Sequence, residues 1–179
     1  MVYIFLADGF EEIEALAPVD ILRRGGVDVK LVGITGEYIS GSHGIVVRSD
    51  IQDFTPDIDT EMIILPGGMP GTRNLEASPL VQSAIDFCVK GGKYIAAICA
   101  APSILGHKGL LSGKRATAFP GFEKDLTGAI VSADSVVTDG NIITAKGAGA
   151  ALEFGFELLK VLKCKDISRK ISNSMQFRK

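Results

Sequence analysis

The chain has 179 residues, close to the ~150 residues of a single domain, and its 46% hydrophobic content is enough for a buried core. Its 19 Lys and Arg against 21 Asp and Glu give a net charge of -2, which excludes the basic field that a polyanion-binding protein needs. We therefore expect one globular domain over residues 1–179 and no nucleic-acid partner.

The first residues carry neither an export signal nor a membrane segment in recognisable form. Met1 to Leu6 lack a basic segment, and Asp8 interrupts the apolar run that a signal peptide requires. No apolar run reaches the ~20 residues that cross a bilayer, so no membrane association is expected. Three widely spaced cysteines favour free thiols in a reducing compartment, and we expect a cytoplasmic protein.

Short apolar runs alternate with segments of helical periodicity along the chain. Strands that are buried on both faces are typical of a parallel sheet with helices on each side. In chain order, the sequence predicts a strand at 2–6, a helix at 11–24, a strand at 29–32, a small antiparallel excursion within 37–53, a strand at 62–65, a helix at 78–90, a strand at 94–98, a helix at 101–105, a strand at 141–145 and a helix at 149–162.

At the start of the first helix, Asp8 and Glu11 fit a capping box, and Glu12 is expected to be solvated. Glu14 differs because apolar residues surround it, and a desolvated carboxyl there would have a raised pKa and hold a proton near neutral pH. Pro18 removes the backbone hydrogen bond to the Glu14 carbonyl, so the helix is interrupted at this acid. The alternative is a simple helix break with a glutamate that reaches solvent.

Two glycine-rich segments follow expected strands. Gly67 and Gly68 come after strand 62–65, and glycines let backbone N–H groups approach a ligand closely. They could form an oxyanion hole beside a nucleophile, or be an ordinary turn. The second segment, at 147–151, lacks the third glycine of a dinucleotide fingerprint and comes too late in the chain, so no nucleotide cofactor is expected.

Cys99 lies between a strand that ends at Ile98 and a helix that opens near Pro102. Three of its neighbours are alanines, and small neighbours are what the tight turn of a nucleophile elbow requires. A thiol at a helix N-terminus is expected to have a lowered pKa and to be nucleophilic. The alternative is that Cys99 is a buried small residue, as most free cysteines are.

The other two cysteines favour structural roles. Cys88 belongs to the amphipathic pattern of helix 78–90 and is expected in the core. Cys164 follows the last expected helix among lysines and is expected to be a surface thiol. Neither has the spacing of a zinc ligand, and the chain has only 2 histidines, so no metal site is expected.

Three segments together resemble the ThiJ/PfpI superfamily, and most closely its branch that contains the Parkinson-associated protein deglycase. They are residues 11–20, 65–68 and 97–100, and the likeness covers nearly the whole chain. The resemblance implies a flavodoxin-like three-layer α/β sandwich with a mostly parallel sheet and a nucleophile elbow. It also implies a homodimer.

The resemblance assigns roles to particular residues. Cys99 is the implied nucleophile, Glu14 is its hydrogen-bonding acid, and the N–H groups of Gly68 and Ala100 are the implied oxyanion hole. The implied activity is that of a cofactor-free glyoxalase, which turns a small α-oxoaldehyde such as methylglyoxal into lactate, or of a deglycase of early glycation adducts. The rival is a redox-sensing stress protein or chaperone in which Cys99 is oxidised without turnover.

Two departures from the family pattern narrow these possibilities. Ala100 stands where peptidase relatives carry histidine, so a peptidase or amidotransferase is disfavoured. Phe119 stands where some deglycase relatives carry histidine, so Glu14 must do the acid and base work alone. Substrate contacts are expected from Gly67, His43 and Arg24, the last at a dimer interface, whereas His107 is expected to be structural.

Overall fold

A six-stranded sheet forms the centre of the computed structural model, which describes residues 1–177. Neighbouring strands are parallel except at one edge, where the last strand runs antiparallel to its neighbour. The order across the sheet is β2 (Val29–Gly33), β1 (Val2–Leu6), β5 (Met62–Leu65), β6 (Tyr94–Ile98), β10 (Ile142–Ala145) and β9 (Val136–Asp139). The mostly parallel α/β arrangement expected from the sequence is confirmed.

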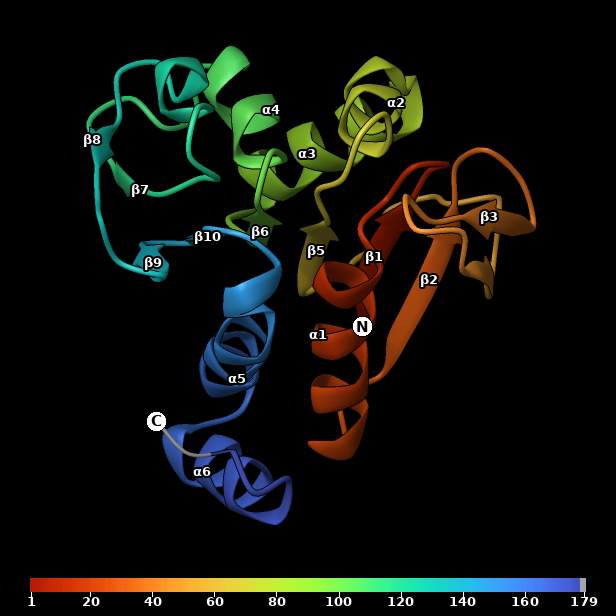
Figure 1. The fold of residues 1–179 in the computed structure, drawn as a ribbon, viewed down its shortest axis with the longest axis vertical. Coiled ribbons are helices and arrows are strands. Elements are labelled where there is room, and N and C mark those ends of the chain that lie inside the picture. The colour runs from red at the N-terminus through yellow and green to blue at the C-terminus, as the bar shows by residue number, and fades with distance from the viewer. Residues whose placement is uncertain (178–179) are drawn as a thin grey trace.

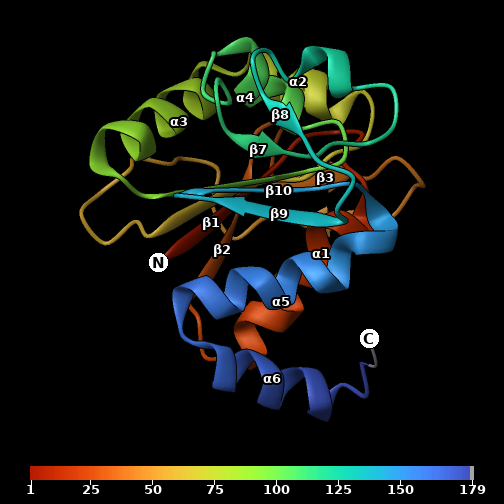
Figure 2. The ribbon, with the colours of Figure 1, turned by 90° about the vertical axis from the view of Figure 1, so that its left-hand side faces the viewer.

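Helices cover both faces of the sheet and give the molecule three layers (Figure 2). One face carries α1 (Glu12–Arg24), α5 (Ala151–Leu162) and α6 (Lys165–Ser174), and the other carries α2 (Gly71–Ala77), α3 (Pro79–Gly91) and α4 (Pro102–His107). Each face has its own apolar cluster, because successive side chains of a strand point to opposite sides. In β1, Ile4 packs in the cluster that includes α1, and Phe5 packs in the cluster that includes α3.

Short elements lie outside the main sheet. The antiparallel excursion expected within 37–53 is present, as β3 (Tyr38–Ser40) paired with β4 (Val46–Arg48). A second pair, β7 (Arg115–Ala116) with β8 (Ile130–Val131), is parallel. Two single turns of 3-10 helix, η1 (Glu123–Asp125) and η2 (Ala148–Ala150), complete the fold.

The predicted capping box at the start of α1 is wrong. Glu11 is the N-cap residue, and its Oε2 accepts a hydrogen bond from the Glu14 N–H at 2.7 Å. Asp8 instead accepts a hydrogen bond from the Ser40 N–H at 2.8 Å. The cause is that residues 8–10 form a turn whose last residue, Phe10, bridges to the β3–β4 hairpin, so the helix begins only after that contact.

Helix α6 is an element that the sequence patterns did not predict. Its apolar side chains Ile167 and Ile171 pack against the cluster between α1, α5 and the sheet, and Ser168 Oγ donates to the Phe156 carbonyl at 2.7 Å. Cys164 lies at its N-cap and is exposed, whereas Cys88 is fully buried, so both predictions for these thiols are confirmed. Within residues 1–177, no helix is long and apolar enough to span a membrane.

The carboxyl ends of β1, β5, β6 and β10 lie at one edge of the sheet because these strands are parallel (Figure 1). The loops that leave them, at 7–11, 66–70, 99–101 and 146–150, therefore converge. Sites in open α/β sheets form at this edge. Figure 1 also shows that α1 begins at the same edge, which brings its first turn to the converging loops.

Candidate active site

Cys99 adopts a backbone conformation that is unusual for a residue with a side chain. Its φ is +66°, in the left-handed region that disfavours a Cβ atom. Hydrogen bonds fix this turn from both sides, since the Cys99 N–H donates to the Ala145 carbonyl at 2.9 Å and the Phe119 N–H donates to the Cys99 carbonyl at 2.8 Å. Strained residues of this kind concentrate at functional sites, and the geometry is that of the predicted nucleophile elbow.

Glu14 is buried beside the thiol. Its side chain is 1% exposed, its carboxyl shares a hydrogen bond with Cys99, and its Oε2 accepts the Gly67 N–H at 3.0 Å. The pKa of Glu14 is raised to about 7, and burial is the largest cause. Hydrogen bonds from Cys99 and from the N–H groups of Gly67 and Ala148 act in the opposite direction and lower this pKa. The expectation of a desolvated acid that titrates near neutral pH is confirmed.

The Cys99 thiol does not have the lowered pKa expected from its position before a helix. Burial raises its pKa to about 12, and the charge and hydrogen bond of Glu14 act in the same direction. The N–H groups of Ala100 and Gly68 lower it, but by less. That expectation is therefore wrong, because α4 is a single short helix of 6 residues and its field is outweighed by desolvation and by a neighbouring carboxylate. At neutral pH the resting site holds a thiol next to a half-ionised carboxyl.

Two backbone N–H groups are directed at the sulfur, those of Gly68 and Ala100. They are the groups expected to form the oxyanion hole. Position 68 requires glycine, because a Cβ there would lie 2.4 Å from the Gly9 carbonyl oxygen. The φ of Gly68, +91°, is also one that residues with a side chain rarely adopt. A Cβ on Gly67 would lie 2.6 Å from both Cys99 Cβ and Glu14 Oε2. The paired glycines therefore let the loop approach both reacting side chains.

A pocket of about 350 Å³ opens beside the acid. Gly147 separates Glu14 from Phe119, since a Cβ on Gly147 would lie 3.1 Å from the Phe119 ring and 3.6 Å from Glu14 Oε1. The pocket is lined by Phe119, Pro120, Ser135 and residues 146–150. Its volume suits a small molecule, at the low end of the size range of ligand pockets.

The segment 146–150 contacts the candidate site, which the sequence patterns did not predict. Its sequence indicates only an incomplete nucleotide-binding motif, whereas in the structure the Ala148 N–H donates to Glu14. The signal that could have found it is its place directly after β10, at the carboxyl edge of the sheet.

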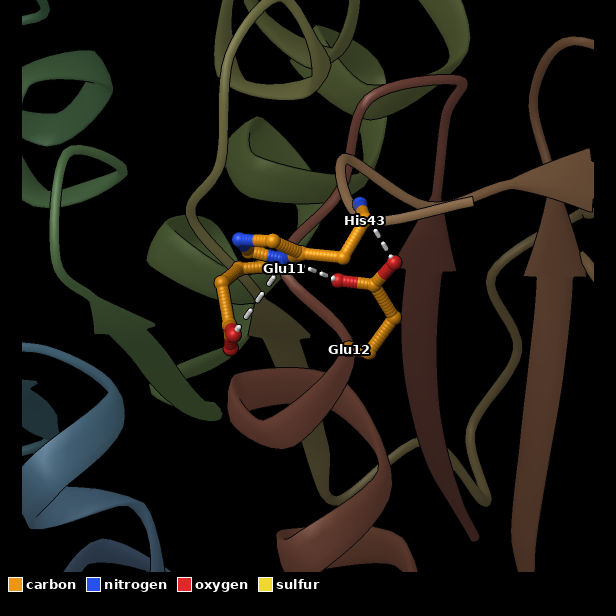
Figure 3. Close-up of side chains that lie close together, drawn as sticks. All are labelled: Glu11, Glu12 and His43. Atoms are coloured by element: carbon orange, nitrogen blue, oxygen red, sulfur yellow. Dashed lines mark hydrogen bonds and ion pairs between the residues drawn. The ribbon is translucent and has the colours of Figure 1, made fainter. Parts of the chain in front are cut away.

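Glu12, expected to be solvated, is buried, so that expectation is wrong. One carboxylate oxygen accepts the His43 N–H at 2.7 Å, and the other lies 2.7 Å from His43 Nδ1 (Figure 3). Burial acts to raise the pKa of Glu12, but the hydrogen bonds from His43 and Ile45 together lower it to about 2. Glu12 thus holds the β3–β4 hairpin against the start of α1.

Glu11, Glu12 and His43 form the one group within residues 1–177 whose ligand atoms are spaced for a metal ion, within 4.8 Å of one another (Figure 3). Their oxygens already accept hydrogen bonds, Glu11 Oε2 from the Glu14 N–H and both Glu12 oxygens from His43. A cation would have to displace these donors at the positive end of α1. We assign no metal to this cluster.

The remaining predicted residues lie farther from the sulfur. His43 projects into solvent, with 70% of its side chain exposed, and no hydrogen bond joins it to Glu14 or Cys99 within residues 1–177. Arg24 pairs with Asp20 at 2.7 Å and lies about 15 Å along α1 from Glu14, at a rise of 1.5 Å per residue. Arg24 therefore does not reach Cys99 or Glu14 of its own chain. The expected contact between Arg24 and the substrate stays a prediction that requires the homodimer.

Comparison with known proteins agrees with this geometry. Residues 1–161 match the DJ-1/PfpI family. The chain is 34% identical over 183 residues to protein DJ-1 homolog A of Arabidopsis thaliana, a match that covers 99% of this chain but 46% of that protein, so the chain spans about half of its length. It is 34% identical over 169 residues to a protein named as a deglycase from Pyrococcus abyssi, covering 90% of this chain and 99% of that one.

The fold gives the same answer as the sequence comparison. The structure superimposes on oxidized DJ-1 of Toxoplasma gondii with a TM-score of 0.91 and 30% identity, over 99% of this chain and 98% of that one. The flavodoxin-like α/β sandwich expected from the sequence is therefore confirmed. The chain belongs to the DJ-1/PfpI family.

Proposed function

We propose that the protein is a cofactor-independent cysteine enzyme that acts on reactive carbonyl compounds, as a glyoxalase or a deglycase. The observation that carries this proposal is the hydrogen-bonded pair of Cys99 and Glu14, with two N–H donors directed at the sulfur. A nucleophile, an acid that titrates near neutral pH and an oxyanion hole are the parts that carbonyl addition needs. The deglycase name of one relative supports the same class.

The first step is addition of the thiol to an aldehyde. Since the pKa of Glu14 is about 7, about half of the molecules have a carboxylate there at neutral pH, and this carboxylate accepts the thiol proton as Cys99 Sγ attacks. The sulfur–carbon bond forms, and the electron pair of the carbonyl moves to its oxygen. The N–H groups of Gly68 and Ala100 stabilise that oxyanion, each by ~3 kcal/mol, before Glu14 returns the proton to it. The product is a hemithioacetal.

The second step moves a proton within the substrate. The Glu14 carboxylate removes the proton from the former aldehyde carbon, and the electron pair left behind forms an enediol with the neighbouring ketone. Protonation of that neighbour gives a hydroxyl-bearing carbon and a thioester to Cys99. One carbon is oxidised and the next is reduced, so the route needs no outside oxidant. Water then cleaves the carbon–sulfur bond, giving lactate from methylglyoxal and restoring the thiol.

A homodimer is part of the proposal. The side chains of Ile13 and Ile45 are more than half exposed. Both residues are neighbours of Glu12: Ile13 follows it in the sequence, and the Ile45 N–H lies 3.5 Å from Glu12 Oε1. Exposed apolar side chains that gather in this way are typical of interaction surfaces. Light scattering should give the mass of a dimer, and Ile13→Asp should give a monomer. The cytoplasmic location stays a prediction.

The redox-sensing role remains the second candidate, favoured by the half-buried thiol beside an acid that can hydrogen-bond to an oxidised sulfur. In that role peroxide would add oxygen to Cys99 before the fully buried Cys88. Turnover separates the two candidates, since a sensor consumes no substrate.

The test is lactate production from methylglyoxal without glutathione. Cys99→Ser should abolish it, and Glu14→Gln should lower it at least ~100-fold, as expected for the loss of a positioned acid and base. Cys164→Ser is the matched control, because this exposed thiol lies outside the site, and it should leave the rate unchanged. Equal rates in the native protein and Cys99→Ser would contradict the proposal.

A further inference from the structure

A second cavity, of about 370 Å³, shares no lining residue with the pocket described above. It is enclosed by α2, α4 and the segment that leads into η1. In Figure 1, both α2 and α4 lie beyond the carboxyl ends of β5 and β6. The polar side chains that line it are Thr72, Arg73, Glu76, Ser103, His107, Lys124 and Asp125.

The wall of this cavity is hydrogen-bonded to the two residues of the oxyanion hole. The Thr72 N–H donates to the Gly68 carbonyl at 2.9 Å, and the Ser103 hydroxyl donates to the Ala100 carbonyl at 2.7 Å. Ala100 directly follows Cys99 in the chain, so the Ser103 side of the cavity contacts the residue next to the nucleophile. A ligand in the cavity would therefore lie next to the two backbone segments that direct N–H groups at Cys99.

The cavity lining holds two cations, Arg73 and Lys124, and two carboxylates, Glu76 and Asp125, of which the carboxylates are paired with His107. Within residues 1–177, the side chains of Arg73 and Lys124 make neither a hydrogen bond nor an ion pair. The two acids nearby are engaged with His107, Glu76 at 2.6 Å from Nδ1 and Asp125 at 3.8 Å from Nε2. The unpaired groups are therefore the two cations, which suit an anionic ligand.

Thr72 supplies an independent sign of a missing ligand. The residue is 2% exposed, and its hydroxyl oxygen is the one buried side-chain polar atom in the described part of the chain that has no hydrogen-bond partner. Buried hydroxyls are nearly always paired, and one that lines a cavity is ordinarily paired with what the cavity binds. A hydroxyl beside a guanidinium and an ammonium group matches the oxygens of a phosphate or carboxylate.

We propose that this cavity is an anion subsite for a phosphate or carboxylate group carried by the carbonyl substrate. The link to the substrate rests on the proposed function, whereas anion binding itself does not. Arg73 would hold the anion through its planar set of donors, with Lys124 and the Thr72 hydroxyl beside it. The enzyme would then prefer aldehydes that bear an acidic group over neutral methylglyoxal.

The first experiment measures anion binding without any reaction. The reduced protein is titrated with inorganic phosphate and, separately, with acetate, and the NMR signals of the Thr72 and Arg73 amides are followed. Arg73→Gln should weaken binding about 10-fold or more, as expected when a hydrogen bond to a charged group is lost. Arg48→Gln is the matched control, because this exposed arginine pairs with Glu37 on the β3–β4 hairpin, and it should leave binding unchanged.

Thr72→Val replaces the hydroxyl with a methyl group of similar size and should weaken binding of the preferred anion without loss of the fold. Phosphate binding that exceeds acetate binding identifies a phosphate subsite, and the reverse order identifies a carboxylate subsite. Absence of saturable binding of either anion would overturn the proposal. Equal binding by Arg73→Gln and Arg48→Gln would overturn it as well.

The second experiment tests the link to Cys99 without requiring turnover. Aldehydes that add reversibly to the thiol protect it from iodoacetamide, so glyceraldehyde 3-phosphate is compared with glyceraldehyde. The phosphate-bearing aldehyde should protect Cys99 at about 10-fold lower concentration, and Arg73→Gln should remove this advantage while protection by glyceraldehyde is unchanged. If both aldehydes protect equally while phosphate still binds, the substrate link is overturned. A protein that passes both tests yet makes no lactate would refute the glyoxalase activity alone.

Discussion

Glu14→Gln should stabilise the folded protein at alkaline pH and have little effect at acidic pH. The pKa of Glu14 is about 7 in the fold against an ordinary value of 4.5. One pKa unit corresponds to ~1.4 kcal/mol, so the difference, 7 minus 4.5, means that ionised Glu14 costs the folded state about 3 kcal/mol. Because the pKa of Glu14 is raised in the fold, the protonated carboxyl makes its full contribution to the free energy of unfolding below pH 4.5. That contribution is lost as the pH rises through about 7.

Glutamine cannot ionise but keeps the hydrogen bonds to Gly67 and Cys99, since its oxygen can accept the Gly67 N–H and its amide can donate to Cys99. Any change in the hydrogen bond from the Ala148 N–H acts equally at both pH values. Urea unfolding of reduced protein at pH 4 and pH 8 should therefore show an excess stability of Glu14→Gln that grows by about 3 kcal/mol between the two conditions. Glu123→Gln, which removes the same charge at an exposed position, is the control. An excess stability that is the same at both pH values would refute the account of Glu14 as a desolvated acid.

Three further predictions concern the same edge of the sheet. The value of kcat/KM should fall as the pH is lowered through about 7, because the Glu14 carboxylate is the base that takes the Cys99 proton, and a pH profile should show the corresponding limb. Gly67→Ala should reduce activity at least ~10-fold, because its Cβ would lie 2.6 Å from Cys99 Cβ and Glu14 Oε2; steady-state kinetics with methylglyoxal would detect this. Glu12→Gln should lower the free energy of unfolding by about 1–3 kcal/mol at pH 7, because the buried carboxylate accepts hydrogen bonds from His43. The difference between the two proteins should shrink as the pH falls from 4.5 towards 2, and urea unfolding would measure it.

The strands of the sheet could be predicted because buried parallel strands are continuous apolar runs. The five expected strands are all present, and β6 leads into Cys99 as the sequence indicated. The short helix α2 was not predicted, because it begins inside a segment with the pattern of a glycine-rich loop. The strand β9 and the helix α6 were missed for another physical reason. Both lie at margins of the fold, where half of each surface faces solvent and only a few apolar residues, such as Ile167 and Ile171, mark the buried side.

The candidate site could be predicted where local chemistry decides the outcome. Burial of Glu14 followed from its apolar neighbours, and the Cys99 turn followed from the small residues around it. The direction of the Cys99 pKa could not be predicted, because it depends on how closely Glu14 packs against the sulfur. The burial of Glu12 depends in the same way on the β3–β4 hairpin, which is 31 residues away from it at His43.

The central claim is that Cys99 forms a covalent bond to the carbonyl carbon during turnover. The most direct measurement is peptide mapping by mass spectrometry after the reaction with methylglyoxal is quenched with acid, which preserves the thioester on Cys99. The account predicts a thioester on Cys99 that is absent at Cys88 and Cys164 and that is lost in Glu14→Gln, which cannot move the proton between the two substrate carbons. Lactate formation by a protein that never carries an adduct on Cys99 would contradict it.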